Sequence, residues 1–150
     1  MPHIRLEPIY GCPHFSAGIA MRNNNGRLEL LVVKDKGNLK FPGGQAEPSE
    51  FEGIWEDPEE TLFREIGEEL GGEVSEFFLI HSADKGDSDH PHTQFFFLTN
   101  IWMGKHGGEL NTLWLGVGEL RQKLLPSHRE AFEATLALLR KESQSVALAA

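Results

Sequence analysis

The chain has 150 residues, of which 39% are hydrophobic and 25% charged, a balance typical of one globular domain with its own core. Its 23 acidic residues outnumber its 14 basic ones and give a net charge of −9, which disfavours broad nucleic-acid binding because such binding relies on basic side chains. The chain has a single cysteine, Cys12, no apolar run of membrane-spanning length and no signal pattern at its N-terminus. These features favour a soluble cytoplasmic protein with no nucleic-acid or membrane partner.

The first predicted elements are two strands, residues 16–21 and 28–34, on either side of Asn23-Asn24-Asn25-Gly26. An Asn-Gly step is a strong signal for a tight hairpin turn, so these strands are predicted to be neighbours. Residues 40–42 form a short extended piece that leads into a turn at Gly43-Gly44.

The best-specified element is a helix that begins after Asp57. Asp57 can cap this helix, Pro58 suits its first position, and Glu60 completes a capping box. Gly71-Gly72 supplies a left-handed stop. Apolar side chains recur with the helical period on one side: Leu62, Phe63, Ile66 and Leu70.

The remaining chain predicts more strands and one more helix. Three strands are expected, at residues 77–83, 93–103 and 113–117. A second capping box, Ser127 to Glu130, opens a final helix, and residues 143–150 are expected to form a flexible tail after a single domain of residues 1–142. Strands around one central helix, with a second helix at the end, predict an α/β (α+β) sandwich.

Three carboxylates of the central helix share one of its sides. Glu65, Glu68 and Glu69 stand at i, i+3 and i+4, where like charges repel and each pair weakens a helix by a few tenths of a kcal/mol, roughly. Taken alone, such a face is usually solvated surface. A bound cation is the functional explanation, because carboxylate oxygens are the ligands that Mg²⁺ prefers.

Two segments together resemble the Nudix box, Gly-x5-Glu-x7-Arg-Glu-(aliphatic)-x-Glu-Glu-x-Gly-(aliphatic). Gly44 is followed after five residues by Glu50, and Arg64-Glu65-Ile66-Gly67-Glu68-Glu69-Leu70-Gly71 matches the second half. Thirteen residues, 51–63, separate these halves in place of seven, so the box carries an insertion of six. Counting back from Arg64 instead makes Glu56 the box glutamate, and both Glu50 and Glu56 stay candidates.

The resemblance implies the αβα sandwich of the Nudix hydrolases around a mixed β-sheet. It implies a site for Mg²⁺, or Mn²⁺ in its place, whose ligands are the Gly44 carbonyl, Glu65, Glu68 and Glu69. Glu68 and Glu69 are also catalytic candidates, together with Arg64, which fixes the carboxylate array. Near the turn and the insertion, Glu47 and Trp55 are candidates for substrate contacts, although Trp55 can equally pack the loop onto the domain.

The implied reaction is hydrolysis of a pyrophosphate bond in a nucleoside diphosphate linked to another group. A nucleoside triphosphate, oxidised ones included, is the first candidate substrate, while dinucleoside polyphosphates and ADP-ribose stay open. The alternative is a catalytically silent Nudix-like protein that binds or senses a nucleotide, and the insertion is the one feature that favours it. The sequence predicts neither the general base nor the oligomeric state.

Overall fold

The computed structural model describes residues 13–48, 55–86, 92–103 and 108–149, with side chains as far as Ser143. The elements follow one another along the chain in this order: β1 (His14–Ile19), β2 (Met21–Asn24), β3 (Arg27–Asp35), β4 (Asn38–Lys40), β5 (Gly43–Gln45), α2 (Pro58–Leu70), β6 (Gly72–Asp84), β7 (Thr93–Met103), β8 (Asn111–Gly116), α3 (Val117–Lys123) and α4 (Pro126–Ala149).

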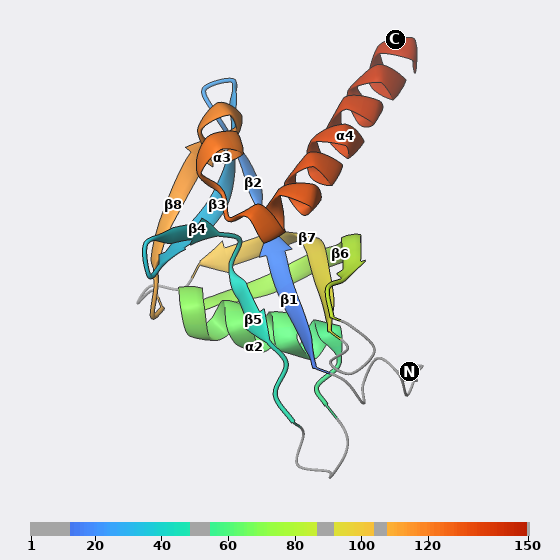
Figure 1. The fold of residues 1–150 in the computed structure, drawn as a ribbon. Helices are drawn as coiled ribbons and strands as arrows, with labels where there is room; N and C mark the ends of the chain where they lie inside the picture. Colours follow the sequence, from blue (N-terminus) through green and yellow to red (C-terminus); the bar gives the residue numbers. More distant parts are fainter. Residues whose placement is uncertain (1–12, 49–54, 87–91, 104–107, 150) are drawn as a thin grey trace.

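The strands form two sheets. The first has the order β5-β1-β7-β6, and it is mixed, because β1 and β7 run parallel while the other neighbours are antiparallel. In the second sheet β3 is central: β2 and β4 pair with successive parts of it, and β8 pairs along its other edge. Figure 1 shows α2 along one face of the first sheet and α4 starting from the opposite face, so the predicted α/β sandwich is confirmed.

Alternating side chains of the strands fill two cores, one under each helical layer. On β1, Phe15 and Ile19 point into a cluster with Phe132 of α4. The second cluster lies under α2 and includes Leu62 and Ile66, both fully buried. This burial fixes the rotation of α2 about its axis, so the helix face with the acidic residues is turned to the β5 side of the sheet.

The local signals of the hairpin and of α2 act as predicted. Asn25 and Gly26 have φ of 54° and 85°, and the Gly26 N–H donates to Asn23 Oδ1 over 2.7 Å. Asp57 caps α2 in a capping box with Glu60. Gly71 ends the helix in the left-handed conformation, with φ 64°.

The structure differs from the sequence-based expectation around the last two helices. The sequence did not predict α3, because Gly116 and Gly118 at its start are weak helix formers and the helix has only seven residues. The last helix begins at Pro126, which suits a first helical position, and Ser127 lies inside it. The helix α4 continues to Ala149, past the start of the expected tail at residue 143, because no glycine or proline follows Pro126 to stop it. The flexibility of this tail stays a prediction.

No helix in the described part of the chain is long and apolar enough to cross a membrane.

The first turn of α4 is attached to the segment that enters β5. His128 is 2% exposed, its Nδ1 accepts the backbone N–H of Phe41 over 3.1 Å, and its ring stacks on that of Phe41. Burial, helped by the nearby Lys40 ammonium, lowers the pKa of His128 to about 3. The ring is therefore neutral, with Nδ1 free to accept, and it anchors the start of the glycine turn.

Acid should weaken the folded protein through His128. Since its pKa is about 3 when folded and 6.5 in the ordinary state, the unfolded chain takes up the proton first, and stability falls between those values as pH drops. The slope is at most about 1.4 kcal/mol per pH unit. Urea unfolding at several pH values should show a flatter dependence for His128→Gln than for wild type or a His92→Gln control. Equal slopes in all three proteins would contradict this cause.

Candidate active site

The site lies where the glycine turn and β5 meet the acidic side of α2. The Gly43 N–H donates to Glu69 Oε1 over 2.7 Å, so the turn and the helix are joined by a buried hydrogen bond. Glu69 is 7% exposed. Burial raises the pKa of Glu69, against the opposing effects of the Lys40 charge and the Gly43 N–H. Glu69 is thus a carboxylate kept in a poorly hydrated place, aimed at the turn.

Lys40 completes this corner, and sequence reasoning missed it. Its Nζ donates to the Gly43 carbonyl over 2.9 Å and to Glu69 Oε2 over 3.2 Å. A signal was present, because Lys40 is a cation three residues before a glycine turn that was expected to face carboxylates. The ammonium therefore lies between the Gly43 carbonyl and Glu69, a predicted metal ligand.

Arg64 is the centre of a second set of contacts. Its Nε and Nη2 grip both oxygens of Glu56, at 2.8 and 2.9 Å. Its Nη1 reaches Glu65 Oε1 at 2.9 Å and Glu68 Oε2 at 3.2 Å, and Nη2 also donates to the Gln45 carbonyl at 2.9 Å. One guanidinium thus links β5, α2 and the residue before the helix cap. Its role in fixing the array stays a prediction.

Glu56, one of the two candidates for the box glutamate, lies against Arg64. Besides Arg64, its Oε1 accepts from the Glu47 N–H and from Thr61 Oγ1, each at 3.0 Å. Burial alone would raise the pKa of Glu56, but the hydrogen bond from Arg64 and these further bonds outweigh it and lower the pKa. Its acceptor positions are occupied, so it braces Arg64. Glu50, the other candidate, lies outside the described residues.

The insertion leaves and rejoins the domain at one point. The Glu56 N–H donates to the Glu47 carbonyl over 3.0 Å, and Pro48 pairs with Trp55 in an isolated antiparallel bridge. Trp55 is half-buried, and the Glu47 side chain is 62% exposed with Oε1 3.4 Å from Arg64 Nη1. Both residues therefore border the carboxylates, and their contact with substrate stays a prediction.

The two glycines of the turn meet the carboxylates in different ways. At Gly44 a Cβ atom would collide with the Glu65 carboxylate, so the missing side chain leaves room for Glu65. At Gly43 the backbone itself is engaged, through its N–H with Glu69 and its carbonyl with Lys40. The Gly44 carbonyl stays a predicted ligand, and the Gly43 carbonyl lies beside it in the turn, in contact with Lys40.

Glu65 and Glu68 differ in exposure. The Glu65 side chain is 14% exposed, and burial raises its pKa, with Arg64 opposing and Glu68 adding to the increase. The Glu68 side chain is 44% exposed. Glu65 and Glu69 therefore form the inner pair of carboxylates, and Glu68 is the outer one.

The loop before β8 holds the last turn of α2. The backbone N–H groups of Glu109 and Leu110 donate to the carbonyls of Glu68 and Glu69, at 3.0 and 3.1 Å. Gly108 lies so close to the Glu69 backbone that a Cβ atom would collide with it. Carbonyl groups at a helix end otherwise lack partners. The backbone that carries the two glutamates is therefore fixed by protein contacts.

The donor set fits a hard divalent cation. Mg²⁺ takes oxygen ligands, and carboxylate oxygens of Glu65 and Glu69 and the Gly43 carbonyl line one corner, where the Lys40 ammonium already acts as a cation. Among the described residues, no three acidic or histidine side chains stand ready as a metal-binding group. In this structure Lys40 contacts Glu69, and Arg64 contacts Glu65 and Glu68.

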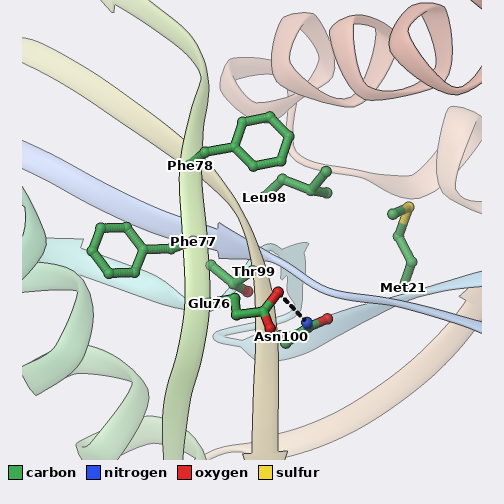
Figure 2. Close-up of a pocket in the computed structure, with 7 residues that line it drawn as sticks. All are labelled: Met21, Glu76, Phe77, Phe78, Leu98, Thr99 and Asn100. Atoms are coloured by element: carbon green, nitrogen blue, oxygen red, sulfur yellow. Dashed lines mark hydrogen bonds between the residues drawn. The ribbon is translucent and has the colours of Figure 1, made fainter. Parts of the chain in front are cut away.

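Another hollow lies away from this site. It is a pocket of about 210 Å³ beside β6. In Figure 2, Phe77 and Phe78 point to opposite sides of this strand, and a dashed line joins Asn100 to Glu76. Asn100 Nδ2 donates to Glu76 Oε2 over 3.3 Å. None of the predicted site residues lines it.

Alanine substitutions at Gly43 and Gly44 should have different effects, the first on stability and the second on the position of the Glu65 carboxylate. In Gly43→Ala the new Cβ would collide with backbone atoms of Ser16 and Ala17, so we expect a loss of about 2 kcal/mol or more in the free energy of unfolding. In Gly44→Ala it would meet only the movable end of Glu65, so folding should change by less than about 1 kcal/mol while kcat falls about 10²-fold. Urea unfolding and steady-state kinetics measure both; equal loss of stability in the two variants would contradict this distinction.

Comparison with known proteins agrees with this geometry. A NUDIX domain model matches residues 13–135. An 8-oxo-dGTP diphosphatase of Proteus vulgaris is 32% identical over 92 residues, which cover 59% of this chain and 77% of that protein. The solution structure of the E. coli ORF135 protein has a TM-score of 0.65 and 23% identity, covering 89% of this chain and 94% of its own. A NUDIX hydrolase of Nitrosomonas europaea has a TM-score of 0.67 and 17% identity, covering 84% and 89%.

The mixed-sheet sandwich with an acidic helix under its glycine turn is that of a Nudix-type nucleotide pyrophosphohydrolase. The chain belongs to the Nudix family. The resemblance drawn from the box residues is confirmed.

Proposed function

We propose that this enzyme requires Mg²⁺, or Mn²⁺ in its place, and hydrolyses a pyrophosphate bond in a nucleoside diphosphate linked to another group. The first candidate substrate is a nucleoside triphosphate, oxidised ones included, and the 8-oxo-dGTP diphosphatase activity named for the Proteus relative supports this choice. The observation that carries the proposal is the inner pair Glu65 and Glu69, held around a cation position beside the Gly43 carbonyl. We expect one catalytic domain that acts in the cytoplasm.

Each residue contributes a separate part of the mechanism. Glu65, Glu69 and a carbonyl of the glycine turn, that of Gly44 or that of Gly43, would hold the cation, with Glu68 as a further ligand or as the base. A bound divalent cation neutralises phosphate charge and assists the ionisation of water. As the base, Glu68 would accept the proton of the attacking water, because its side chain is 44% exposed and can be reached from solvent. Arg64 keeps Glu65 and Glu68 in place, a second layer of support that metal sites commonly need.

Substrate selection is assigned to the surroundings of the carboxylates. Glu47 and Trp55 border them at the base of the insertion. We propose that these two residues contact the part of the nucleotide that extends beyond the carboxylates. Since neither residue has a chemistry unique to one base or sugar, dinucleoside polyphosphates and ADP-ribose belong in the same test.

The test is a substrate panel with the purified protein. GTP, dGTP, 8-oxo-dGTP, a diadenosine tetraphosphate and ADP-ribose are incubated with Mg²⁺, with Mn²⁺ and with EDTA, and the products are separated by ion-exchange chromatography. We expect metal-dependent release of pyrophosphate or of a nucleoside monophosphate from at least one compound, and loss of it in Glu69→Gln.

The catalytically silent alternative gives another result in the same panel. A sensor protein would bind a nucleotide tightly, by calorimetry, and release no product with either metal. The insertion was the reason to consider it, and the position of Glu56 against Arg64 argues against a displaced box.

A further inference from the structure

Lys40 occupies a position that the proposed metal would also need. Its side chain is 14% exposed, and its ammonium contacts the Gly43 carbonyl at 2.9 Å and Glu69 Oε2 at 3.2 Å. Mg²⁺ binds its oxygen ligands at about 2.0–2.1 Å in a near-octahedral shell. An ammonium hydrogen-bonded to the same two oxygens blocks that shell, so the two cations exclude each other.

On the basis of the proposed function, we propose that Lys40 is a built-in competitor for the metal: its ammonium neutralises Glu69 in the metal-free protein and withdraws when a divalent cation binds. Burying a carboxylate without a partner is costly, and Glu69 is 7% exposed. A resident cation removes this penalty until the metal arrives. The metal must then displace it, which lowers the apparent affinity.

The structure also shows where the ammonium can go. Asp35, at the end of β3, has Oδ2 3.9 Å from Lys40 Nζ, and its side chain is 37% exposed. Lysine carries its charge on a flexible four-carbon stem with rotatable donors, so a small rotation moves the ammonium from Glu69 toward Asp35. Lys40 therefore has a second acceptor outside the proposed coordination shell.

Arg64, the other cation of the site, lacks this freedom. Its guanidinium is fixed by two hydrogen bonds to Glu56 and one to the Gln45 carbonyl. Arg64 therefore stays in place and keeps its contacts with Glu65 and Glu68. The two cations thus divide their roles: Arg64 supports the array, and Lys40 competes for it.

The test measures Mn²⁺ affinity, through the EPR signal of free Mn²⁺, for wild type, Lys40→Gln and Lys40→Arg above neutral pH without nucleotide. Removing one positive charge next to a divalent ion should tighten binding about tenfold in Lys40→Gln. Lys40→Arg keeps the charge and should stay within about threefold of wild type. The metal-free melting temperature should fall in Lys40→Gln, and its rise on adding Mn²⁺ should exceed that of wild type.

The withdrawal to Asp35 is tested by a double-mutant cycle. Asp35→Asn should weaken Mn²⁺ binding severalfold in the wild-type background, because Lys40 loses its second acceptor. The same change in Lys40→Gln should have a clearly smaller effect, since no ammonium remains to be moved. If Asp35→Asn changes Mn²⁺ affinity equally in both backgrounds, Asp35 acts only through its charge near the metal. The proposed movement of Lys40 toward Asp35 would then be refuted.

Two results separate this inference from the proposed function. If wild type binds Mn²⁺ and hydrolyses a nucleotide, while Lys40→Gln binds Mn²⁺ equally or more weakly, then Lys40 only orders the ligands and the competition is refuted. If wild type binds no Mn²⁺ and cleaves nothing in the panel, the proposed function itself fails.

Discussion

Glu69→Gln is expected to lower kcat about 10³-fold while the protein stays folded. The amide has the shape of the carboxyl group and can still accept the Gly43 N–H, but it cannot supply a charged ligand. A bound metal contributes several kcal/mol to transition-state stabilisation. Its loss corresponds to about 10³-fold in kcat, because about 1.4 kcal/mol is tenfold in rate. The measurement is kcat and KM with the nucleotide that the panel identifies, beside circular dichroism and the melting temperature.

A matched control makes that result specific. Glu73→Gln removes an exposed carboxylate of β6, outside the site, and should leave kcat within about twofold of wild type. KM should change much less than kcat in Glu69→Gln, the mark of an interaction made mainly in the transition state. If Glu69→Gln kept nearly the kcat of wild type, the hydrolysis would not depend on the Glu69 carboxylate.

Arg64→Met should cost both stability and activity. The change leaves Glu56, whose side chain is 15% exposed, without its bidentate partner, and breaking a mostly buried ion pair costs about 3 kcal/mol. For a chain of this size that is a drop of roughly 6–12 °C in melting temperature. Glu65 and Glu68 also lose their support, so kcat should fall about 10²-fold through misplacement alone. Calorimetry and steady-state kinetics measure the two losses.

Two further variants separate charge from shape at this position. Arg64→Lys keeps the charge and loses the planar fork, so its melting temperature should lie between those of wild type and Arg64→Met. Combining Arg64→Met with Glu56→Gln removes the unpaired charge and should restore part of the stability, without restoring kcat. An unchanged melting temperature in Arg64→Met would mean that the contacts of Glu56 carry little free energy.

The parts of the site that the sequence predicted are those that depend on neighbours along the chain. Asp57, Pro58 and Gly71 set the ends of α2 through local hydrogen bonds and backbone preference, so the helix and the common side of Glu65 and Glu69 followed from spacing. The failure at α3 is also local, because its start signals, two glycines, were weak.

The choice between Glu50 and Glu56, and the role of Lys40, could not be obtained in this way. Glu56 is the brace because it meets Arg64 across eight residues, and Lys40 meets Glu69 across 29. Such contacts depend on how β5 docks on α2. The packing of β5 against α2 arises only in the folded domain, and no periodic pattern in the sequence predicts it.

The pairing of Glu47 with Glu56 makes the motif independent of the number of residues between them. Because these two residues are joined by a backbone hydrogen bond, Gly44 and Arg64 keep their separation in space whatever length of chain joins Pro48 to Trp55. Longer loops cost little additional closure entropy. We therefore expect a shortened segment to preserve the Arg64–Glu56 contact. A search for this box by fixed spacing would miss a chain with an insertion at this point, whereas one that allows a variable interval there would find it.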